Sequence, residues 1–200
     1  MLNSAIISVY DKTGLKDFLE GLHQITPEIK IFSSGGTARK IDELGYDVIE
    51  ISSYTGFPES PGGLVKTLHP KVHGGILLDK SRLDERKYLE ENGILTFGLV
   101  ACNLYPFKEV SSSGAPKEEV VENIDIGGPT LIRSAAKGAL RHGRVAPVVD
   151  REDYNMVIEE MKNNNGELTS ETIRRLALKA FEITSLYDDN IRKWLYFEGV

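Results

Sequence analysis

The sequence predicts an α/β fold with three layers, in which a mostly parallel central sheet lies between helices on both faces. Short runs of branched apolar residues alternate along the chain with segments of helical periodicity, which is the pattern of consecutive β-α-β units. The chain has 200 residues, a length that suits one globular domain. We therefore expect one domain over residues 1–200, with a helical C-terminal segment that begins near residue 151.

The N-terminal part supplies three predicted strands and two helices. The strands are runs rich in β-branched residues, of the kind that parallel sheets bury on both faces: residues 5–9, 29–32 and 48–51. Between the first two runs, Leu15, Phe18 and Leu22 recur at helical spacing. After the second run, the turn at residues 34–37 leads into a helix that continues through Leu44.

The middle of the chain is irregular, and the alternation resumes after it. From Ser52 to about His73 no period is recognisable, and glycine and proline are frequent. A long irregular segment inside a compact domain is usually functional or mobile. Further strands are predicted at residues 76–78, 97–103 and 145–149, and further helices at 82–91, 117–123, 130–139, 151–163 and 169–196. Residues 111–116 are predicted to form a loop.

The composition excludes several classes of protein. Thirty Asp and Glu against 24 Lys and Arg give a net charge of −6, which disfavours a general nucleic-acid-binding surface. No apolar run approaches the roughly 20 residues of a membrane helix, and the N-terminus lacks the basic region of a signal peptide. One cysteine excludes an intramolecular disulfide and a thiolate zinc site. We therefore expect a cytoplasmic protein that binds neither nucleic acid nor a membrane.

The turn Ser34-Gly35-Gly36-Thr37, between a predicted strand and a predicted helix, is a candidate phosphate site. Its glycines let backbone amides turn toward a ligand, its hydroxyls add donors, and the helix N-terminus adds partial positive charge. It matches neither a Walker loop nor a dinucleotide-binding fingerprint. A helix cap without a ligand is the alternative. Lys12, after the first strand, either pairs with the same phosphate or is a solvated side chain.

The irregular segment contains Lys66, with apolar residues close to it on both sides, in the run Val65-Lys66-Thr67-Leu68. A lysine in a loop without a packing period is a candidate for a cation that faces a ligand. His69 and His73 have the spacing of two metal ligands on one helix face. However, Pro70 intervenes, no acidic residue lies between them and no third ligand is evident, so we expect no metal site.

Side chains that follow the most apolar predicted strand are expected to face a ligand. Ligands of open parallel sheets bind beyond the carboxyl ends of the strands, where Asn103 and Tyr105 lie. Tyr105 is either a directional hydrogen-bond donor or an aromatic cover over the core. Cys102 is expected to be a small buried apolar residue.

The run from Ile124 to Thr130 is the most suggestive in the chain. Pro129 suits the first turn of a helix, and two preceding glycines expose amides at its positive end. Asp125 beside those amides is either a helix cap or a carboxylate aimed at a reacting group. Lys137 shares the predicted helix but lies roughly 12 Å along its axis from Pro129, at about 1.5 Å per residue. Sequence geometry alone does not bring Lys137 and Asp125 to one site.

Together and in this order, the motifs resemble those of inosine monophosphate (IMP) cyclohydrolase, usually the N-terminal domain of a bifunctional purine-biosynthesis protein. The runs that carry the resemblance spread over nearly the whole chain: residues 11–14, 34–37, 55–58, 65–70, 101–107, 124–130 and 135–137. The resemblance implies a methylglyoxal-synthase-like fold, related to the Rossmann fold. Since the chain stops where the second half of the bifunctional protein would begin, it also implies a stand-alone cyclohydrolase.

The resemblance implies ring closure of 5-formamidoimidazole-4-carboxamide ribonucleotide (FAICAR) to IMP, the last step of de novo purine biosynthesis. The carboxamide nitrogen attacks the formyl carbon, and water then leaves. By resemblance, Asp125 orients the nitrogen and takes its proton. Lys66 and Tyr105 match the donors to the formyl oxygen, and Lys137 matches the acid that protonates the departing hydroxyl. No metal or organic cofactor is implied, because nothing is oxidised and both reacting groups belong to one molecule.

The resemblance also assigns residues to substrate binding. Those around the 5′-phosphate are Lys12, Ser34, Gly35, Gly36, Thr37 and Thr67. The other matching positions are Tyr10, Asp11, Leu64, Cys102, Asn103, Ile126 and Gly127. Tyr10 stands where family members often carry a small hydroxyl residue, Leu64 where many carry arginine, and Gly138-Ala139 where an Asn-His pair is common. A nucleotide is thus the implied small-molecule partner, and a homodimer the implied assembly.

Two alternatives share this fold and its phosphate loop. A phosphate-eliminating lyase of the methylglyoxal synthase kind would have no obvious use for Lys66, Tyr105 and Lys137. A regulatory module that binds a nucleotide without turnover would need the phosphate loop but neither Asp125 nor Lys137. Formation of IMP from FAICAR distinguishes a cyclohydrolase from both.

Overall fold

The centre of the molecule is a five-stranded, all-parallel sheet. Its strands are β1 (Ser4–Ser8), β2 (Lys30–Ser33), β3 (Ile49–Glu50), β4 (Leu99–Cys102) and β5 (Ala146–Val148). They lie in the order β3-β2-β1-β4-β5, and every neighbouring pair is parallel. The computed structural model describes residues 2–58 and 60–197, so residues 1, 59 and 198–200 of the predicted domain lie outside the described residues.

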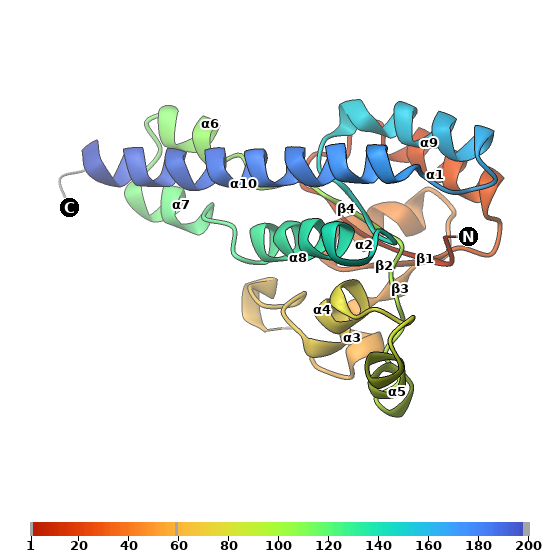
Figure 1. The fold of residues 1–200 in the computed structure, drawn as a ribbon. Helices are drawn as coiled ribbons and strands as arrows, with labels where there is room; N and C mark the ends of the chain where they lie inside the picture. The colour runs from red at the N-terminus through yellow and green to blue at the C-terminus, as the bar shows by residue number, and fades with distance from the viewer. Residues whose placement is uncertain (1, 59, 198–200) are drawn as a thin grey trace.

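Helices cover both faces of this sheet (Figure 1). One face carries α1 (Leu15–Ile25), α2 (Gly35–Glu43) and α9 (Tyr154–Asn163), and the other carries α3 (Ile51–Thr55), α4 (Pro70–Leu77) and α8 (Gly127–His142). Successive residues of β1 point to opposite faces, so that Ile7 packs under α1 and α9 while Ile6 packs toward α4 and α8. Both side chains are fully buried. The predicted α/β class, with helices on both faces of a parallel sheet, is confirmed.

The remaining helices are short, with one exception. They are η1 (Pro61–Gly63), α5 (Leu83–Glu91), α6 (Phe107–Ser112), α7 (Lys117–Glu122), η2 (Arg151–Asp153) and α10 (Ser170–Phe197). Helix α6 extends into the predicted loop at residues 111–116, and α8 is longer at both ends than the predicted helix at 130–139. Gly143 ends α8 in a left-handed conformation with φ of 67°.

The predicted strand at residues 76–78 was wrong, because this segment is the end of α4. Pro70 begins the helix, and its fixed φ suits the first turn. The Nδ1 atom of His69 caps it by accepting a backbone N–H at 3.1 Å. Val72 and Ile76, one turn apart, are fully buried. A short apolar run does not distinguish a buried strand from a buried helix.

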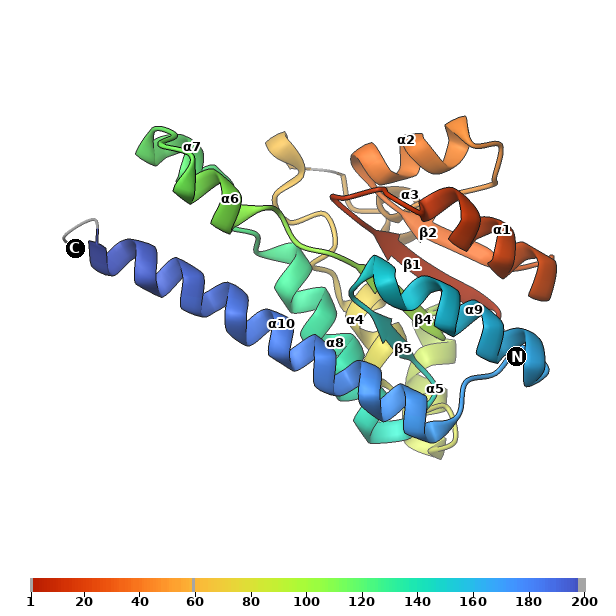
Figure 2. The same ribbon diagram turned by 90° about the horizontal axis from the view of Figure 1, so that it is seen from above.

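Helix α10 runs along the sheet and continues beyond it (Figure 2). Its first half packs against α8 and β5 through residues such as Ile173 and Ala177. Its second half forms an apolar cluster with α6 and α7, built on Phe107, Val120 and Tyr187. This cluster fixes α6 and α7 relative to the sheet. In the described part of the chain, no helix is both long and apolar enough to cross a membrane.

The order of strand addition reverses at β1. Strand β1 pairs with β2 on one side and with β4 on the other, and the connecting helices cover opposite faces. Such a switch point leaves a crevice beyond the carboxyl ends of the two central strands, where ligands of open α/β sheets bind. The segments that leave the sheet there begin at Val9, Ser34 and Asn103. The sequence motifs therefore meet at the carboxyl ends of the central strands.

Packing between α1 and α9 requires a glycine at position 21. A Cβ atom built on Gly21 would lie 2.7 Å from Cγ2 of Ile158 on α9. We predict that Gly21→Ala lowers the free energy of unfolding by about 1–2 kcal/mol, since overpacking outweighs the better helix propensity of alanine. Urea unfolding measures this change.

The control is Gly74→Ala in α4, where a Cβ atom would meet its nearest neighbour at an ordinary 3.5 Å. That variant should be as stable as the wild type or more stable. In an Ile158→Ala background, Gly21→Ala should cost less than in the wild type. An equal cost in both backgrounds would show that contact with Ile158 is not the cause.

Candidate functional site

A cavity of about 580 Å³ lies beyond the carboxyl ends of β1, β2 and β4. Most of the site residues predicted from the sequence line it: Tyr10, Lys12, Ser34, Gly36, Thr37, Leu64, Lys66, Thr67, Cys102, Asn103, Tyr105, Asp125, Ile126 and Gly127. They come from five separate segments of the chain. The switch point of the sheet brings these segments together. Ligands of open α/β folds bind at such switch points.

The N-terminus of α2 forms one wall of this cavity. Ser34 is its N-cap and has 2% exposure, yet its Oγ atom has no hydrogen-bond partner among the described residues. Gly35 is left-handed with φ of 56°, and the Nζ atom of Lys66 lies 2.7 Å from the position that a Cβ would take there. An unpartnered hydroxyl, helix amides and an ammonium group therefore converge on one point. This arrangement suits an anion such as phosphate.

The hydroxyl of Thr37 makes structural hydrogen bonds to the backbone and is not free to bind a ligand. It donates to the carbonyl of Val9 at 2.8 Å and accepts the backbone N–H of the same residue at 3.2 Å. These bonds tie the end of β1 to α2. The predicted contact of Thr37 with phosphate is thus left to its backbone N–H.

The loop after β1 is clamped by Asn103, which follows β4. Its Oδ1 atom accepts the backbone N–H of Tyr10 at 2.6 Å and that of Asp11 at 3.1 Å, and its Nδ2 atom donates to the carbonyl of Asp11 at 2.9 Å. The Asp11 carboxylate lies outside the cavity lining and binds Thr13 and Arg151. Lys12 lines the cavity, and its Nζ atom donates to the carbonyl of Tyr10 at 3.1 Å. Asn103 and Asp11 therefore shape the loop, and Lys12 is the cation that it carries.

Asp125 lies in the segment between α7 and α8, half-buried at the cavity wall. Its Oδ1 atom accepts the backbone N–H of Gly128 at 2.8 Å, so the carboxylate also caps α8. Burial raises the pKa of Asp125, although hydrogen bonds from the backbone of Gly128 and Tyr105 and the charge of Lys66 oppose the shift. A carboxylate with a raised pKa holds a proton more tightly and is a stronger base.

Two potential donors share the cavity with this carboxylate. Lys66 is half-buried and close enough to Asp125 for its charge to affect the carboxyl pKa. Tyr105 is 40% exposed and packs edge-on against Tyr10, with ring centroids 5.5 Å apart. Burial and the charge of Asp125 raise the pKa of Tyr105, so its hydroxyl stays protonated at neutral pH. Cys102 is fully buried, as expected, and burial raises the pKa of its thiol.

Lys137 is the predicted catalytic residue that the fold does not bring to this cavity. Helix α8 is continuous from Gly127 to His142, so Lys137 lies roughly 15 Å along the axis from its first residue, at about 1.5 Å per residue. Lys137 is exposed and lines a separate groove of about 390 Å³ between α8 and α10, with Arg133, Leu140 and Phe181 among its neighbours. Within one chain it is separated from Asp125.

The sequence did not identify several residues around the cavity. Gly62, Gly63 and Glu122 line it, and Tyr187 of α10 accepts the backbone N–H of Asp125 at 2.8 Å. The sequence placed Tyr187 only within the predicted helix at residues 169–196. No local pattern reveals that its hydroxyl contacts a residue 62 positions earlier.

The two histidines with metal-ligand spacing have other partners. His69 caps α4, and the Nδ1 atom of His73 lies 2.8 Å from Oγ of Ser134 on α8. Among the described residues, no group of three or more His, Cys, Asp or Glu side chains could hold a metal ion.

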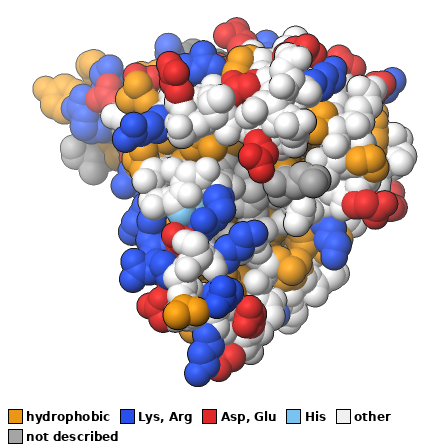
Figure 3. Space-filling view, turned by 45° about the vertical axis from the view of Figure 1, so that its right-hand side comes forward, with side chains coloured by type: hydrophobic (Ala, Val, Ile, Leu, Met, Phe, Trp, Pro, Cys, Tyr) orange, Lys and Arg blue, Asp and Glu red, His pale blue; other side chains and the backbone are white. Residues whose placement is uncertain are grey.

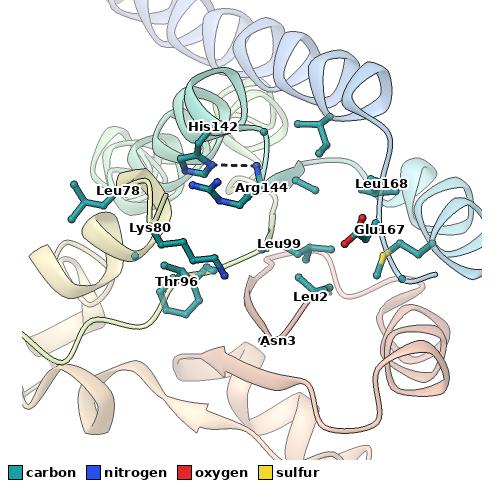
Figure 4. Close-up of a pocket in the computed structure, with 18 residues that line it drawn as sticks. Leu2, Asn3, Leu78, Lys80, Thr96, Leu99, His142, Arg144, Glu167 and Leu168 are labelled. Carbon is teal, nitrogen blue, oxygen red and sulfur yellow. Dashed lines mark hydrogen bonds between the residues drawn. The ribbon is translucent and has the colours of Figure 1, made fainter. Parts of the chain in front are cut away.

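A second cavity, of about 260 Å³, lies at the opposite end of the strands, beside their amino ends (Figure 4). Lys80, Arg144 and Glu167 surround it above a floor that includes Leu2 and Leu99. It contains none of the residues that the sequence motifs pointed to.

Basic side chains also gather around α5 on one face of the molecule (Figure 3). Three arginines of this region form ion pairs: Arg82 and Arg141 with Glu85, and Arg144 with Asp79. The carboxylates within this group of cations reduce its attraction for a polyanion.

Comparison with known proteins agrees with this geometry. Residues 14–130 match the model of the MGS-like domain. The chain belongs to the MGS-like domain family. Residues 135–199, which include the second half of α8 and all of α10, match the AICARFT/IMPCHase bienzyme family. The MGS-like match covers the turn at residues 34–37, Lys66, Tyr105 and Asp125, and the second match covers Lys137.

Two relatives are named "Bifunctional purine biosynthesis protein PurH". The one from Persephonella marina is 50% identical over 96% of this chain, and the one from Chlorobium phaeobacteroides is 45% identical over 98%. The chain spans 36% and 37% of their respective lengths. A solved structure titled "Crystal structure of ForH" covers 98% of this chain and 100% of its own, with a TM-score of 0.80 and 29% identity.

The raised pKa of Asp125 leads to a prediction on stability. Because the folded protein holds this proton more tightly than the unfolded chain does, ionisation of Asp125 destabilises the fold above the ordinary carboxyl pKa of about 3.9. Asp125→Asn should therefore match the wild type in acid and become the more stable protein as the pH rises through the folded pKa of Asp125. Urea unfolding at intervals from acid to neutral pH tests this.

The control is Asp17→Asn, at an exposed acid in the first turn of α1. This variant should not show the same gain over the wild type, because the Asp17 side chain is exposed to solvent and burial does not oppose its charge. A wild type that is more stable than Asp125→Asn at neutral pH would contradict the argument from burial.

Proposed function

We propose that this MGS-like domain is an IMP cyclohydrolase, which closes the formamido and carboxamide groups of FAICAR into the purine ring of IMP. The observation that carries the proposal is that Lys66, Tyr105 and Asp125 share one cavity with the unpartnered Ser34 at the start of α2. The names of the PurH relatives and the match to the AICARFT/IMPCHase family support it. A methylglyoxal-synthase-like lyase would have no obvious use for Lys66 and Tyr105, and a regulatory module would not need Asp125.

The 5′-phosphate would bind at the N-terminus of α2. The Oγ atom of Ser34 supplies a donor, the amides that follow supply others, and Lys66 and Lys12 supply positive charge at the rim. Gly127 allows Thr67 to lie against the start of α8, with Oγ1 2.9 Å from where a Cβ of Gly127 would lie. Phosphate bound there would direct the imidazole ring of the substrate toward Asp125.

Ring closure needs a base and an oxyanion site. Asp125 would accept a proton from the carboxamide nitrogen as that nitrogen forms its bond to the formyl carbon. Lys66 and Tyr105 would donate to the formyl oxygen, on which negative charge develops. The formyl oxygen takes up two protons in all, and the former formamido nitrogen gives up its own proton. The C–O bond then breaks, water leaves, and a C=N bond completes the ring. Both reacting groups belong to one bound molecule, so positioning supplies much of the rate.

The first prediction of this proposal concerns turnover. Lys66→Ala should lower kcat by about 100-fold or more, and Asp125→Ala by about 100- to 10,000-fold, because each removes a group that acts on the transition state. The assay follows the ultraviolet absorbance of IMP formed from FAICAR, and circular dichroism verifies the fold. Lys40→Ala, at an exposed lysine of the same α2 helix, is the matched control and should retain wild-type turnover.

The same assay separates the alternatives. A wild-type chain that binds IMP but forms none from FAICAR would be a regulatory module. Release of inorganic phosphate from dihydroxyacetone phosphate without ring closure would identify a lyase. Wild-type rates in either Lys66→Ala or Asp125→Ala would contradict the roles assigned to these residues.

The proposal includes a cytoplasmic homodimer in which Lys137 acts on the cavity of the other chain. Lys137 does not share the cavity of its own chain. It lines a groove that contains both apolar and polar side chains, among them Leu140, Phe181 and Arg133. Leu140, which lines the same groove, is more than half exposed. A contact between two chains at this groove would bury Leu140 and would carry Lys137 to the partner's cavity, where the departing hydroxyl needs an acid.

Mixing two inactive variants tests this assignment. In a mixed dimer of Lys66→Ala and Lys137→Ala chains, one site has both lysines if Lys137 acts across the interface, and neither has both if it acts within its own chain. After subunit exchange, an equal mixture should recover about a quarter of the wild-type activity. Analytical ultracentrifugation of the wild type establishes the dimer. A dimer whose mixture stays inactive after exchange would contradict action across the interface.

A further inference from the structure

One side chain of α10 reaches the backbone that carries Asp125. The Oη atom of Tyr187 accepts the backbone N–H of Asp125 at 2.8 Å and donates to the carbonyl of Asn123 at 2.8 Å. One hydroxyl thus binds two backbone groups of the short segment between α7 and α8. Both bonds span more than 60 positions of sequence.

The ring that carries this hydroxyl is fixed. Tyr187 is buried, with 8% exposure, and its ring lies edge-on to Phe107 at 6.1 Å between centroids. Val120 of α7 completes the cluster, and Trp194 also packs edge-on against Phe107, with ring centroids 5.8 Å apart. Since the ring is held by α6, α7 and α10 together, its hydroxyl has a defined position relative to the cavity.

The segment that the hydroxyl binds has no regular structure of its own. Helix α7 ends at Glu122 and α8 begins at Gly127. Backbone hydrogen bonds tie Asn123 and Ile124 to α7, whereas the backbone N–H of Asp125 binds the Tyr187 side chain. Tyr187 holds the backbone of Asp125 from one side, and the N–H of Gly128 holds its carboxylate from the other. Together with the hydrogen bond from the backbone of Tyr105, these contacts set the direction in which the carboxylate points into the cavity.

We propose that Tyr187 is a positioning residue for Asp125, through which the C-terminal helix α10 fixes the geometry of the reacting carboxylate. The proposal rests on the cyclohydrolase function proposed above. Tyr187 does not line the cavity and touches no reacting atom; it acts through the backbone of Asp125. Its removal would leave a backbone donor and a backbone acceptor without their partner and allow the segment to shift. A displacement of about 1 Å at a reacting group can cost as much as 100-fold in rate.

The test is Tyr187→Phe, which keeps the ring and its packing and removes only the hydroxyl. We expect kcat for IMP formation to fall about tenfold, while KM for FAICAR changes less than twofold, because the phosphate site on α2 is untouched. Amide hydrogen exchange at Asp125 should be faster than in the wild type, since its N–H loses its acceptor. A change of packing alone would not produce this combination.

The matched control is Tyr196→Phe, which removes a hydroxyl from the same helix at a residue that is 75% exposed. It should leave kcat, KM and the exchange rate of Asp125 unchanged. Wild-type kcat in Tyr187→Phe would overturn the proposal, as would an unchanged exchange rate at Asp125. If the wild type itself forms no IMP, the proposed function fails, and the exchange measurement still decides whether Tyr187 holds Asp125. Because exchange is measured on folded protein, a lower yield of the variant does not affect that result.

Discussion

Parallel pairing of β1 with both β2 and β4 is the constraint on which the rest of the structure depends. It places the carboxyl ends of three strands side by side, and the chain leaves each of them through a segment that carries polar or charged residues. Continuous apolar sequence enforces this pairing, because strands of this kind are stable only when both faces are covered. The phosphate loop, the clamp at Asn103 and the Lys66 segment share a cavity because the sheet leaves its crevice there.

The site resolves an apparent conflict between the charge of the protein and that of its proposed substrate. A net charge of −6 opposes a polyanion. A single nucleotide needs only a local concentration of donors, and the start of α2 provides it with Ser34, helix amides and the ammonium group of Lys66. Asp125 occupies the same cavity, where burial raises its pKa and the nearby lysine opposes that rise. The site thus combines an anion-binding end with a basic carboxylate, as an intramolecular ring closure requires.

Much of this arrangement could be predicted from the sequence, and the exceptions have physical causes. Turn chemistry and strand position identified residues 34–37, Asn103 and Tyr105, because both are local properties of the chain. The run at residues 76–78 was assigned to the wrong element, since apolar character alone does not separate a strand from a buried helix. Lys137 was correctly seen to lie far along its helix from Pro129, and the continuous α8 keeps it there. Tyr187 escaped notice because its contact with Asp125 depends on tertiary packing of α6, α7 and α10.

We propose that the cavity at the carboxyl ends of the strands binds a nucleotide with its phosphate on the N-terminus of α2. A crystal structure of the chain with IMP decides this. Phosphate oxygens should lie within hydrogen-bonding distance of Oγ of Ser34 and the first amides of α2, with the purine base beside Lys66 and Asp125. A phosphate bound at the opposite end of the strands, near Lys80 and Arg144, or a base directed away from Asp125, would contradict it.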